Sequence, residues 1–403
     1  MRFAVGVMLI AAFECGQAPA APGSATPMAA ATASTLDPLE RVLAEQPGTV
    51  CDGWAPTREP DRMEALQLVA RGDHACARIS SGRVRCWGSN ASGQLATCED
   101  TPHSAVPQTF PGVNRAQDVA VGRYGTCVVD EAGALWCSEH VRALLGAEGP
   151  GRIEGVTKAA AVAVGDLHAC VLLAGDQILC FGRGDAGEAL GPRARIEERD
   201  GHESGAGFVD VQQPKALVAG SAHNCALEGQ GRVMCWGQNT MGQLGDPTVG
   251  TELDGNRGTP RRVASLPYAQ SLHAEQDTTC AVTDAGELFC WGEGFGAQAL
   301  GVRVPAATQA AMGPGFVCLA TADGGLWCGG EDMSFVAEGA AGFLPGYAET
   351  QGVAVGTGFV CARRGDGMVL CQGTNALGQL GGQHSEQARR LQPTMVLLGG
   401  VGI

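Results

Sequence analysis

Cysteine is the residue type in this chain with the most chemistry to offer. Its thiolate binds metal ions, and two thiols can be oxidised to a disulfide. Seven pairs of cysteines have their members ten positions apart: Cys76 and Cys86, Cys127 and Cys137, Cys170 and Cys180, Cys225 and Cys235, Cys280 and Cys290, Cys318 and Cys328, and Cys361 and Cys371. A zinc site would need a tight cluster such as Cys-x2-Cys with a second pair close to it. The wide, regular spacing therefore favours seven disulfides over metal ligation or free thiols.

Histidine is the other residue type that recurs in the pattern. Two residues before a first cysteine stand His74, His168 and His223, an arrangement that could describe a ring of metal ligands. The matching positions in the other repeats are Gly125, Thr278, Phe316 and Phe359. A position that accepts phenylalanine and threonine is a packing position, so we expect no metal site and no cofactor. The sequence also lacks a serine nucleophile elbow, a phosphate loop and an H-E-x-x-H motif, and we predict that the protein is not an enzyme.

Each cysteine pair is predicted to lie on a β-hairpin. Placing Cys76 opposite Cys86 pairs Ile79 with Arg83 and leaves residues 80–82 as a three-residue loop. Such loops commonly end in a left-handed residue, where glycine is favoured because it has no Cβ. Glycine stands at this position in six of the seven copies: Gly82, Gly133, Gly231, Gly286, Gly324 and Gly367. The cysteines then become direct cross-strand neighbours, and each bridge should contribute about 2–3 kcal/mol in the chain-entropy model.

The hairpins recur at intervals typical of β-propeller blades. Successive first cysteines are 51, 43, 55, 55, 38 and 43 residues apart, and a period of about 40–50 residues rich in short strands indicates a propeller. Each blade is interpreted as opening with a strand that bears Pro or Val, followed by an apolar strand and then the hairpin. An Asn-x-x-Gly-Gln-Leu turn follows the second cysteine in three blades, at 90–95, 239–244 and 375–380. Blades two and six lack this turn.

These residues carry a family resemblance. Residues 74–95 (HACARISSGRVRCWGSNASGQL) and 223–245 (HNCALEGQGRVMCWGQNTMGQLG) resemble the repeat of the regulator of chromosome condensation family. The resemblance implies a seven-bladed β-propeller of four-stranded antiparallel blades. With the cysteine pairs, the expected fold is all-β over residues 64–403 with one hairpin disulfide in each blade. The chain is also similar to a subgroup of secreted bacterial propellers with paired cysteines, some of which inhibit β-lactamases. The tail Gln392–Leu398 repeats the opening of a blade, so we expect it to complete the first blade and close the ring.

The start of the chain resembles an export signal. An eleven-residue apolar run, Phe3–Phe13, follows Arg2; it is too short to span a membrane and typical of a signal peptide. We therefore expect residues 1–20 to be a signal peptide, or a lipoprotein signal that ends before a lipidated Cys15, although Glu14 is atypical there. Either alternative places the protein outside the cytoplasm, secreted or in the cell envelope, where disulfides form.

An Ala/Pro-rich linker is predicted between the signal and the propeller. It covers residues 21–63 and includes a short helix near 37–46, because Asp37, Pro38 and Glu40 have the order of a capping box. Cys51 and Cys98 are left over after the repeat pairs are assigned, and we expect them to form an eighth bridge. That bridge would tether the linker to the end of the first blade.

Charge and insertions give the remaining functional expectations. A formal net charge of −15 with a pI near 4.9 argues against nucleic-acid binding, which needs clustered basic residues.

Two insertions, Pro192–Gln212 and Asp246–Arg262, occur at the same point of adjacent blades and should project from one face. They supply the candidate partner-binding residues, which are Arg195, Glu197, Glu198, Arg199 and Asp254.

The favoured function is that of an exported, monomeric, non-enzymatic scaffold that binds another, unidentified protein through one face. Membrane attachment is expected only through a lipid on Cys15. The first alternative is a carbohydrate-binding or hydrolytic propeller, which the low aromatic content of 5% disfavours. The second is a structural component of the cell envelope.

Overall fold

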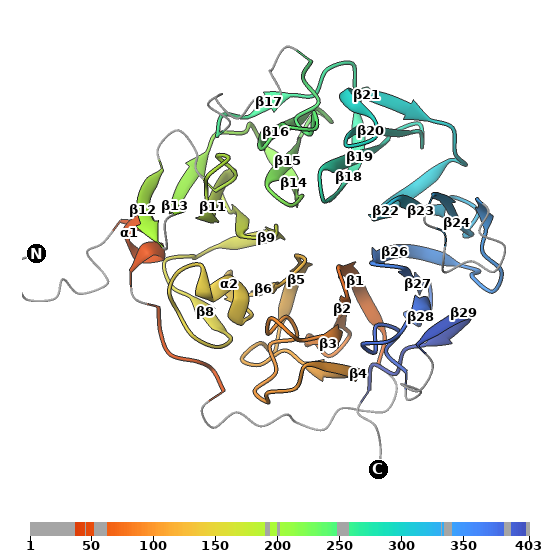
Figure 1. Ribbon diagram of the computed structural model, residues 1–403, viewed down its shortest axis with the longest axis horizontal. Helices are drawn as coiled ribbons and strands as arrows, with labels where there is room; N and C mark the ends of the chain where they lie inside the picture. The colour runs from red at the N-terminus through yellow and green to blue at the C-terminus, as the bar shows by residue number, and fades with distance from the viewer. Residues whose placement is uncertain are drawn as a thin grey trace, which may run out of the picture. The chain divides into compact units, whose positions relative to one another are not determined.

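Short antiparallel sheets make up nearly all of the regular structure. The computed structural model describes residues 37–44, 46–51, 63–189, 194–199, 202–247, 258–331, 333, 341–382 and 388–399. Seven sheets stand side by side as the blades of a propeller, and their innermost strands gather around the centre of the ring (Figure 1). The predicted seven-bladed propeller is thereby confirmed.

In six blades the strands follow the chain from the centre to the rim, and in blade 3 the outermost strand precedes its neighbour in the chain. Blades 1 and 2 comprise β1 (Ala65–Arg71), β2 (His74–Ile79), β3 (Val84–Ser89), β4 (His103–Thr109), β5 (Ala116–Val121), β6 (Thr126–Asp130), β7 (Leu135–Cys137) and β8 (Gly151–Ile153). Blades 3 and 4 comprise β9 (Ala159–Val164), β10 (His168–Leu173), β11 (Gln177–Arg183), β12 (Arg195–Arg199), β13 (His202–Val209), β14 (Pro214–Ala219), β15 (His223–Glu228), β16 (Val233–Gly237) and β17 (Arg261–Arg262). Blades 5 and 6 comprise β18 (Ala269–Glu275), β19 (Thr278–Thr283), β20 (Leu288–Gly292), β21 (Gly296–Val302), β22 (Ala307–Gly313), β23 (Phe316–Thr321), β24 (Leu326–Gly330) and β25 (Gly342–Phe343). Blade 7 comprises β26 (Thr350–Gly356), β27 (Phe359–Arg364), β28 (Val369–Thr374) and β29 (Arg389–Met395).

The cysteine hairpins have the predicted register. In every blade the two cysteines face each other directly across the second and third strands. Each pair forms a disulfide, with Cα atoms 4.0–4.1 Å apart. From blade 1 to blade 7 the bridges are Cys76–Cys86, Cys127–Cys137, Cys170–Cys180, Cys225–Cys235, Cys280–Cys290, Cys318–Cys328 and Cys361–Cys371. All seven predicted hairpin pairings are therefore present.

The hairpin turn is also as predicted. In blade 1 the amide of Ile79 donates to Arg83 O at 2.9 Å, and Gly82 has a φ of +87°. Only glycine adopts this angle without strain, because any other residue would bring a Cβ into collision with the backbone. Local turn chemistry and the covalent bridge therefore specify the same hairpin.

The predicted closure of the ring by the C-terminal strand is wrong. Strand β29, which contains most of Gln392–Leu398, pairs with β28 of its own blade, placing Thr394 opposite Cys371. The Pro-bearing strand of each repeat belongs to the blade of the preceding hairpin, as β4 with Pro107 shows in blade 1. The assumed starting point of the repeat therefore lies one strand too early. Among the described strands, each blade is built from one continuous segment, and none is shared between the two ends of the chain.

Blade 7 instead closes on blade 1 through packing and individual hydrogen bonds. One apolar cluster contains Leu68 of β1 together with Phe359 and Val396 of blade 7. Trp87 Nε1 donates to Gln379 O at 2.9 Å across the junction, and the backbone amide of Ala65 donates to Gly367 O at 2.8 Å. These contacts hold together the only pair of neighbouring blades that chain continuity does not connect.

A buried arginine ties blade 1 to blades on the far side of the ring. Arg71, at the end of β1, is 4% exposed. Its Nη1 donates to Val164 O at 3.2 Å and to Ala219 O at 2.8 Å. Its guanidinium also lies 3.1 Å from the Glu275 carboxylate and 3.4 Å from that of Asp166. Arg71 thereby contacts blades 3, 4 and 5 and lines one end of a central channel of about 360 Å³.

The predicted loop at 192–212 is wrong in its described part. Strands β12 and β13 form a hairpin there, with Ile196 opposite Gly205, and β13 supplies the fourth strand of blade 3. Strand β12 adds a fifth strand at the rim, so this sheet is wider than the other six. Residues 195–199 are polar except for Ile196, which suits an outer strand with no core to cover. Of the second insertion, only residues 246–247 and 258–262 are described, and β17 lies at its end.

The described segment before the propeller packs against blades 2 and 3; we call residues 37–44 and 46–51 the strap. Helix α1 (Pro38–Leu43) has the capping box predicted for Asp37 and Glu40, and Leu39 and Val42 are buried in the core cluster of blades 2 and 3. Further along, Val50 N donates to Pro150 O at 3.0 Å. The strap thus covers the outer edge of blade 2, whose rim strand β8 has only three residues.

One blade turn carries a carboxyl group where the others carry an amide. In the Asn-x-x-Gly-Gln-Leu turns the glutamine oxygen accepts the backbone amide two residues earlier, as between Gln94 and Ser92 at 2.8 Å. In blade 3 Glu188 takes this place and accepts from the amide of Ala186 at 2.9 Å. Burial raises the pKa of Glu188 from about 4.5 to about 7. Burial therefore outweighs the hydrogen bond from Ala186, which favours the ionised carboxylate.

Replacing Arg71 with methionine should destabilise the ring strongly. The Glu275 carboxylate would lose its counter-charge in a buried site, where burial already raises its pKa. Removing one partner of a buried ion pair typically costs about 3–5 kcal/mol. Chemical denaturation should therefore show a much lower unfolding midpoint for Arg71→Met. Arg123→Met is the matched control on an exposed arginine, and equal midpoints for the two variants would contradict the assigned role.

Replacing Glu188 with glutamine should stabilise the protein only when the solution is not acidic. The pKa of Glu188 is higher in the folded protein than in the unfolded chain. The stability that its protonated carboxyl contributes is therefore fully present below pH 4.5 and is lost as pH rises through about 7. Glu188→Gln removes this dependence. Its advantage over the natural chain should grow by about 2 kcal/mol between pH 5 and pH 8. Melting temperatures measured across this range test the expectation, with the exposed Glu203→Gln as control; parallel curves for Glu188→Gln and the natural chain would refute it.

Candidate functional site

One face of the ring collects the longest connections. In every blade the first and third strands end, and the second and fourth begin, at this face; we call the connecting segments there the turn face. Its described acidic residues are Asp73, Glu99, Asp100, Glu139, Glu148, Asp166, Asp185, Glu188, Asp246, Asp277, Glu293 and Glu331. Its described arginines are Arg123 and the buried Arg142. The opposite face is more balanced, since its connections include Arg83, Arg115, Lys158, Arg232 and Arg303.

An aromatic and basic cluster interrupts this acidic surface. Tyr124 lies in the connection between β5 and β6, with the Arg123 guanidinium 5.4 Å from the centre of its ring. The centre of the His140 ring lies 5.4 Å from the centre of the Tyr124 ring, and the two rings are tilted by 50°. His140 is fixed in turn by a 3.1 Å hydrogen bond between its Nε2 and Asp166 O. Tyrosine and arginine held in place at a protein surface are typical of the residues that dominate binding energy at interfaces.

Helix α2 (Glu139–Ala143) positions this cluster. It stands where other blades have the Asn-x-x-Gly-Gln-Leu turn, and it begins at Ser138, whose hydroxyl accepts the amide of Thr126 at 2.9 Å. The buried Arg142 anchors its other end, donating to Glu148 O and Gly149 O at 2.7 Å each. The side chain of His140 is thereby directed toward Tyr124.

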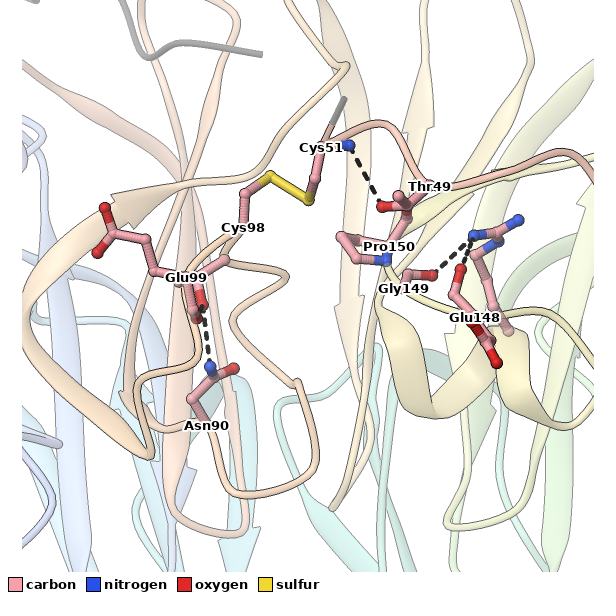
Figure 2. Close-up of a disulfide and its surroundings, with 10 residues drawn as sticks. Thr49, Cys51, Asn90, Cys98, Glu99, Glu148, Gly149 and Pro150 are labelled. Atoms are coloured by element: carbon pink, nitrogen blue, oxygen red, sulfur yellow. Dashed lines mark hydrogen bonds between the residues drawn. A yellow bond between two sulfur atoms is a disulfide. The ribbon is translucent and has the colours of Figure 1, made fainter. Parts of the chain in front are cut away.

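A groove of about 690 Å³ lies beside the cluster. The first blade's turn at 90–100 forms one wall, α2 forms another, and Thr49 and Cys51 of the strap form the rim. Figure 2 shows the Cys51–Cys98 disulfide that joins the strap to this turn. The lining includes the carboxylates of Glu99, Asp100 and Glu139, so the groove suits a cationic group.

The three recurring histidines are structural, as expected. Each is buried and bonds to the next blade: His74 to Thr126 Oγ1 at 3.0 Å, His168 to Asn224 Oδ1 at 2.9 Å, and His223 to Thr279 Oγ1 at 2.7 Å. Burial lowers their pKa values to about 3, 4 and 3 respectively. They are neutral above mildly acidic pH and act as hydrogen-bonded packing between blades.

The predicted partner-binding residues do not gather at the turn face. Arg195 forms ion pairs with Asp37 and with Glu40, the latter at 2.7 Å, and so attaches the strap to the rim of blade 3. The backbones of Glu197, Glu198 and Arg199 belong to strand β12. Asp254 and Cys15 lie outside the described residues.

Neither a metal centre nor a membrane span is found within the described ranges. Across them no group of three or more His, Cys, Asp or Glu side chains could hold a metal ion. Neither helix in the same ranges has the length and apolar character required to cross a bilayer.

Sequence reasoning missed the cluster around Tyr124. A usable signal was present, because blade two lacks the repeat's turn and has Ser138-Glu139-His140 instead. The approach of Tyr124 to His140, however, depends on how α2 folds back over the blade. The sequence alone shows the departure from the pattern and does not show the contact.

Comparison with known proteins agrees with the repeat pattern. The family models described as regulator of chromosome condensation repeat match residues 72–94 and 215–243, and residues 230–282. The ultraviolet-B receptor of Arabidopsis thaliana is 29% identical over 250 residues, which cover 58% of this chain and 54% of the receptor. The chain spans about half or less of the length of the curated relatives it matches.

Solved structures share the fold. The structure of human WBSCR16 has a TM-score of 0.65 at 18% identity, covering 78% of this chain and 94% of that one. Prp20p from Saccharomyces cerevisiae, described with its binding properties to Gsp1p and histones, has a TM-score of 0.62 at 16% identity, with 85% and 90% covered. The repeat matches therefore show that the chain carries repeats of the regulator of chromosome condensation family within residues 72–94 and 215–282.

Proposed function

We propose that this propeller is an exported, non-enzymatic scaffold that binds another protein through its turn face, with Tyr124 at the centre of the interface. The observation that supports this most directly is the cluster of Arg123, Tyr124 and His140, which is held rigidly beside an open groove. We place the binding surface away from the insertion at 192–212, whose described strands, at 195–199 and 202–209, lie at the outer edge of blade 3.

Charge indicates the kind of partner. The carboxylates of Glu99, Asp100 and Glu139 line the groove, and Arg123 is the sole exposed arginine among the described connections of this face. A partner with a basic surface would be attracted to the face before contact and would place a lysine or arginine in the groove. Because such attraction is screened by salt, binding should weaken at high ionic strength.

The relatives support the general class of activity. Prp20p is described as binding Gsp1p and histones, and a second structure of the yeast protein contains Kap60. Rigid propellers of this family therefore serve as protein-binding surfaces. The identity of the partner does not transfer, because these similarities are at 15–16% sequence identity.

Export is the second part of the proposal. Eight disulfides within the described residues indicate an oxidising compartment. The signal at residues 1–20 and the lipidation of Cys15 would account for this location and remain predictions from the sequence.

Truncating Tyr124 should abolish partner capture. A tyrosine at an interface hot spot contributes about 2 kcal/mol or more, so Tyr124→Ala should bind at least about 30-fold more weakly. The measurement is affinity capture from cell-envelope and culture-fluid proteins of the source organism at about 0.1 M and about 0.5 M salt, a range over which screening of charge is expected to change strongly.

Tyr268→Ala is the matched control, because Tyr268 is 62% exposed in the connection between β17 and β18 on the opposite face. A photo-crosslinking amino acid placed at each of the two positions should label a partner only from position 124. Capture that survives Tyr124→Ala and is lost in Tyr268→Ala would overturn the assignment of the face. Turnover of a glycan or peptide library without any captured protein would overturn the scaffold function itself.

A further inference from the structure

We propose that the Cys51–Cys98 disulfide is a thiol-exchange site that opens and closes in the folded protein, and that its substrate is a thiol without net negative charge. Accessibility distinguishes this bridge from the others. Cys98 is exposed and Cys51 is partly exposed. The fourteen hairpin cysteines are at most 1% exposed, so the blades shield their sulfurs from a reductant in solution.

The groove provides the approach to this bridge. Both Cys51 and Cys98 line the cavity of about 690 Å³ on the turn face, and the close-up in Figure 2 shows the bridge between the strap and the first blade's turn. A small thiol fits in such a volume. Since Cys98 is the more exposed partner, its sulfur is the one that an incoming thiolate attacks.

The strap has enough other contacts to stay in place when the bridge opens. Arg142 donates to Pro47 O, and the amide of Glu154 donates to Gln46 Oε1 at 2.8 Å. Helix α1 packs into the core cluster of blades 2 and 3. Each hairpin bridge lies within one blade, so none depends on Cys51. The two thiols would therefore remain close together after reduction, and the disulfide could form again without unfolding.

The exchange follows ordinary disulfide chemistry. The thiolate of a dithiol attacks Cys98 Sγ, a mixed disulfide forms, and Cys51 Sγ leaves as a thiolate that takes a proton from water. The second thiol of the reagent then attacks the mixed disulfide and releases Cys98 as a thiol. Two electrons and two protons pass from the dithiol to the bridge, and the reagent leaves as a disulfide.

Charge around the groove selects the reagent. Glu99 follows Cys98 directly, and Asp100 and Glu139 lie on the same lining. These carboxylates repel an anionic thiol and attract a cationic one. The preference should diminish as salt screens the carboxylates.

Limited reduction of the folded protein tests the proposal. The natural chain is treated with dithiothreitol, alkylated at intervals and mapped by mass spectrometry. Cys51 and Cys98 should be labelled at least about tenfold faster than any hairpin cysteine, because exchange rates follow access to the sulfur. The double variant with Cys51→Ala and Cys98→Ala should take up no label over the same period and keep its cooperative melting transition. Hairpin cysteines labelled at the same rate, or a folded protein that takes up no label at Cys51 and Cys98, would overturn the proposal.

The charge selection has its own test. Cysteamine should open the bridge faster than mercaptoethanesulfonate, by a factor on the order of ten at low salt once rates are corrected for thiolate fraction. Glu99→Lys should reduce or reverse this ratio, whereas Glu203→Lys, on a different blade, should leave it unchanged. Equal rates for the two reagents would show that the groove does not select by charge. Since no binding partner takes part, these results stand independently of the proposed function.

Discussion

Because no strand is shared between the first and last blades, closure of the ring depends on side-chain packing and on individual hydrogen bonds. Blade 7 packs against blade 1 through the cluster that contains Leu68 and Phe359, and Trp87 adds a hydrogen bond across the junction. Arg71 complements this from the centre by reaching backbone oxygens of blades 3 and 4 and the Glu275 carboxylate of blade 5. The positions of the face connections, and with them the candidate site, follow from this closure.

The parts of the fold that were predictable from sequence are those specified within one short segment. The Cys76–Cys86 register and the positive φ at Gly82 are both local, because the turn and the covalent bridge lie within a single hairpin. The start of the repeat was not predictable in this way, since a Pro-bearing strand between two hairpins can pair with either one. Strand β12 was missed because an outer strand with no core face carries no apolar alternation.

The candidate site was only partly accessible to sequence reasoning. The cysteine pairs and the packing role of His74, His168 and His223 follow from comparing repeats with one another. The contact of Tyr124 with His140 joins two connections of blade 2, and a pattern search along the chain does not detect it. In a repeat protein, a specific surface that forms where one blade differs from the others is not found by a search for the repeat pattern. Blade 2, with its helix α2, is such a blade.

The Cys76–Cys86 bridge lies, in sequence, inside the loop that Cys51–Cys98 closes, and this nesting constrains how the disulfides form. Cys51 precedes Cys76, Cys86 and Cys98 in the chain, and pairing these four cysteines in sequence order would join Cys51 to Cys76. The native arrangement places Cys76–Cys86 inside the loop closed by Cys51–Cys98. Pairing in sequence order therefore does not give the native bridges: Cys51 has to stay reduced until Cys98 has been made, or an isomerase has to rearrange a wrong first pairing. The bridges of the amino-terminal blade consequently depend on delayed pairing or on rearrangement, whereas each of the six remaining hairpin bridges joins two cysteines that are consecutive in the chain.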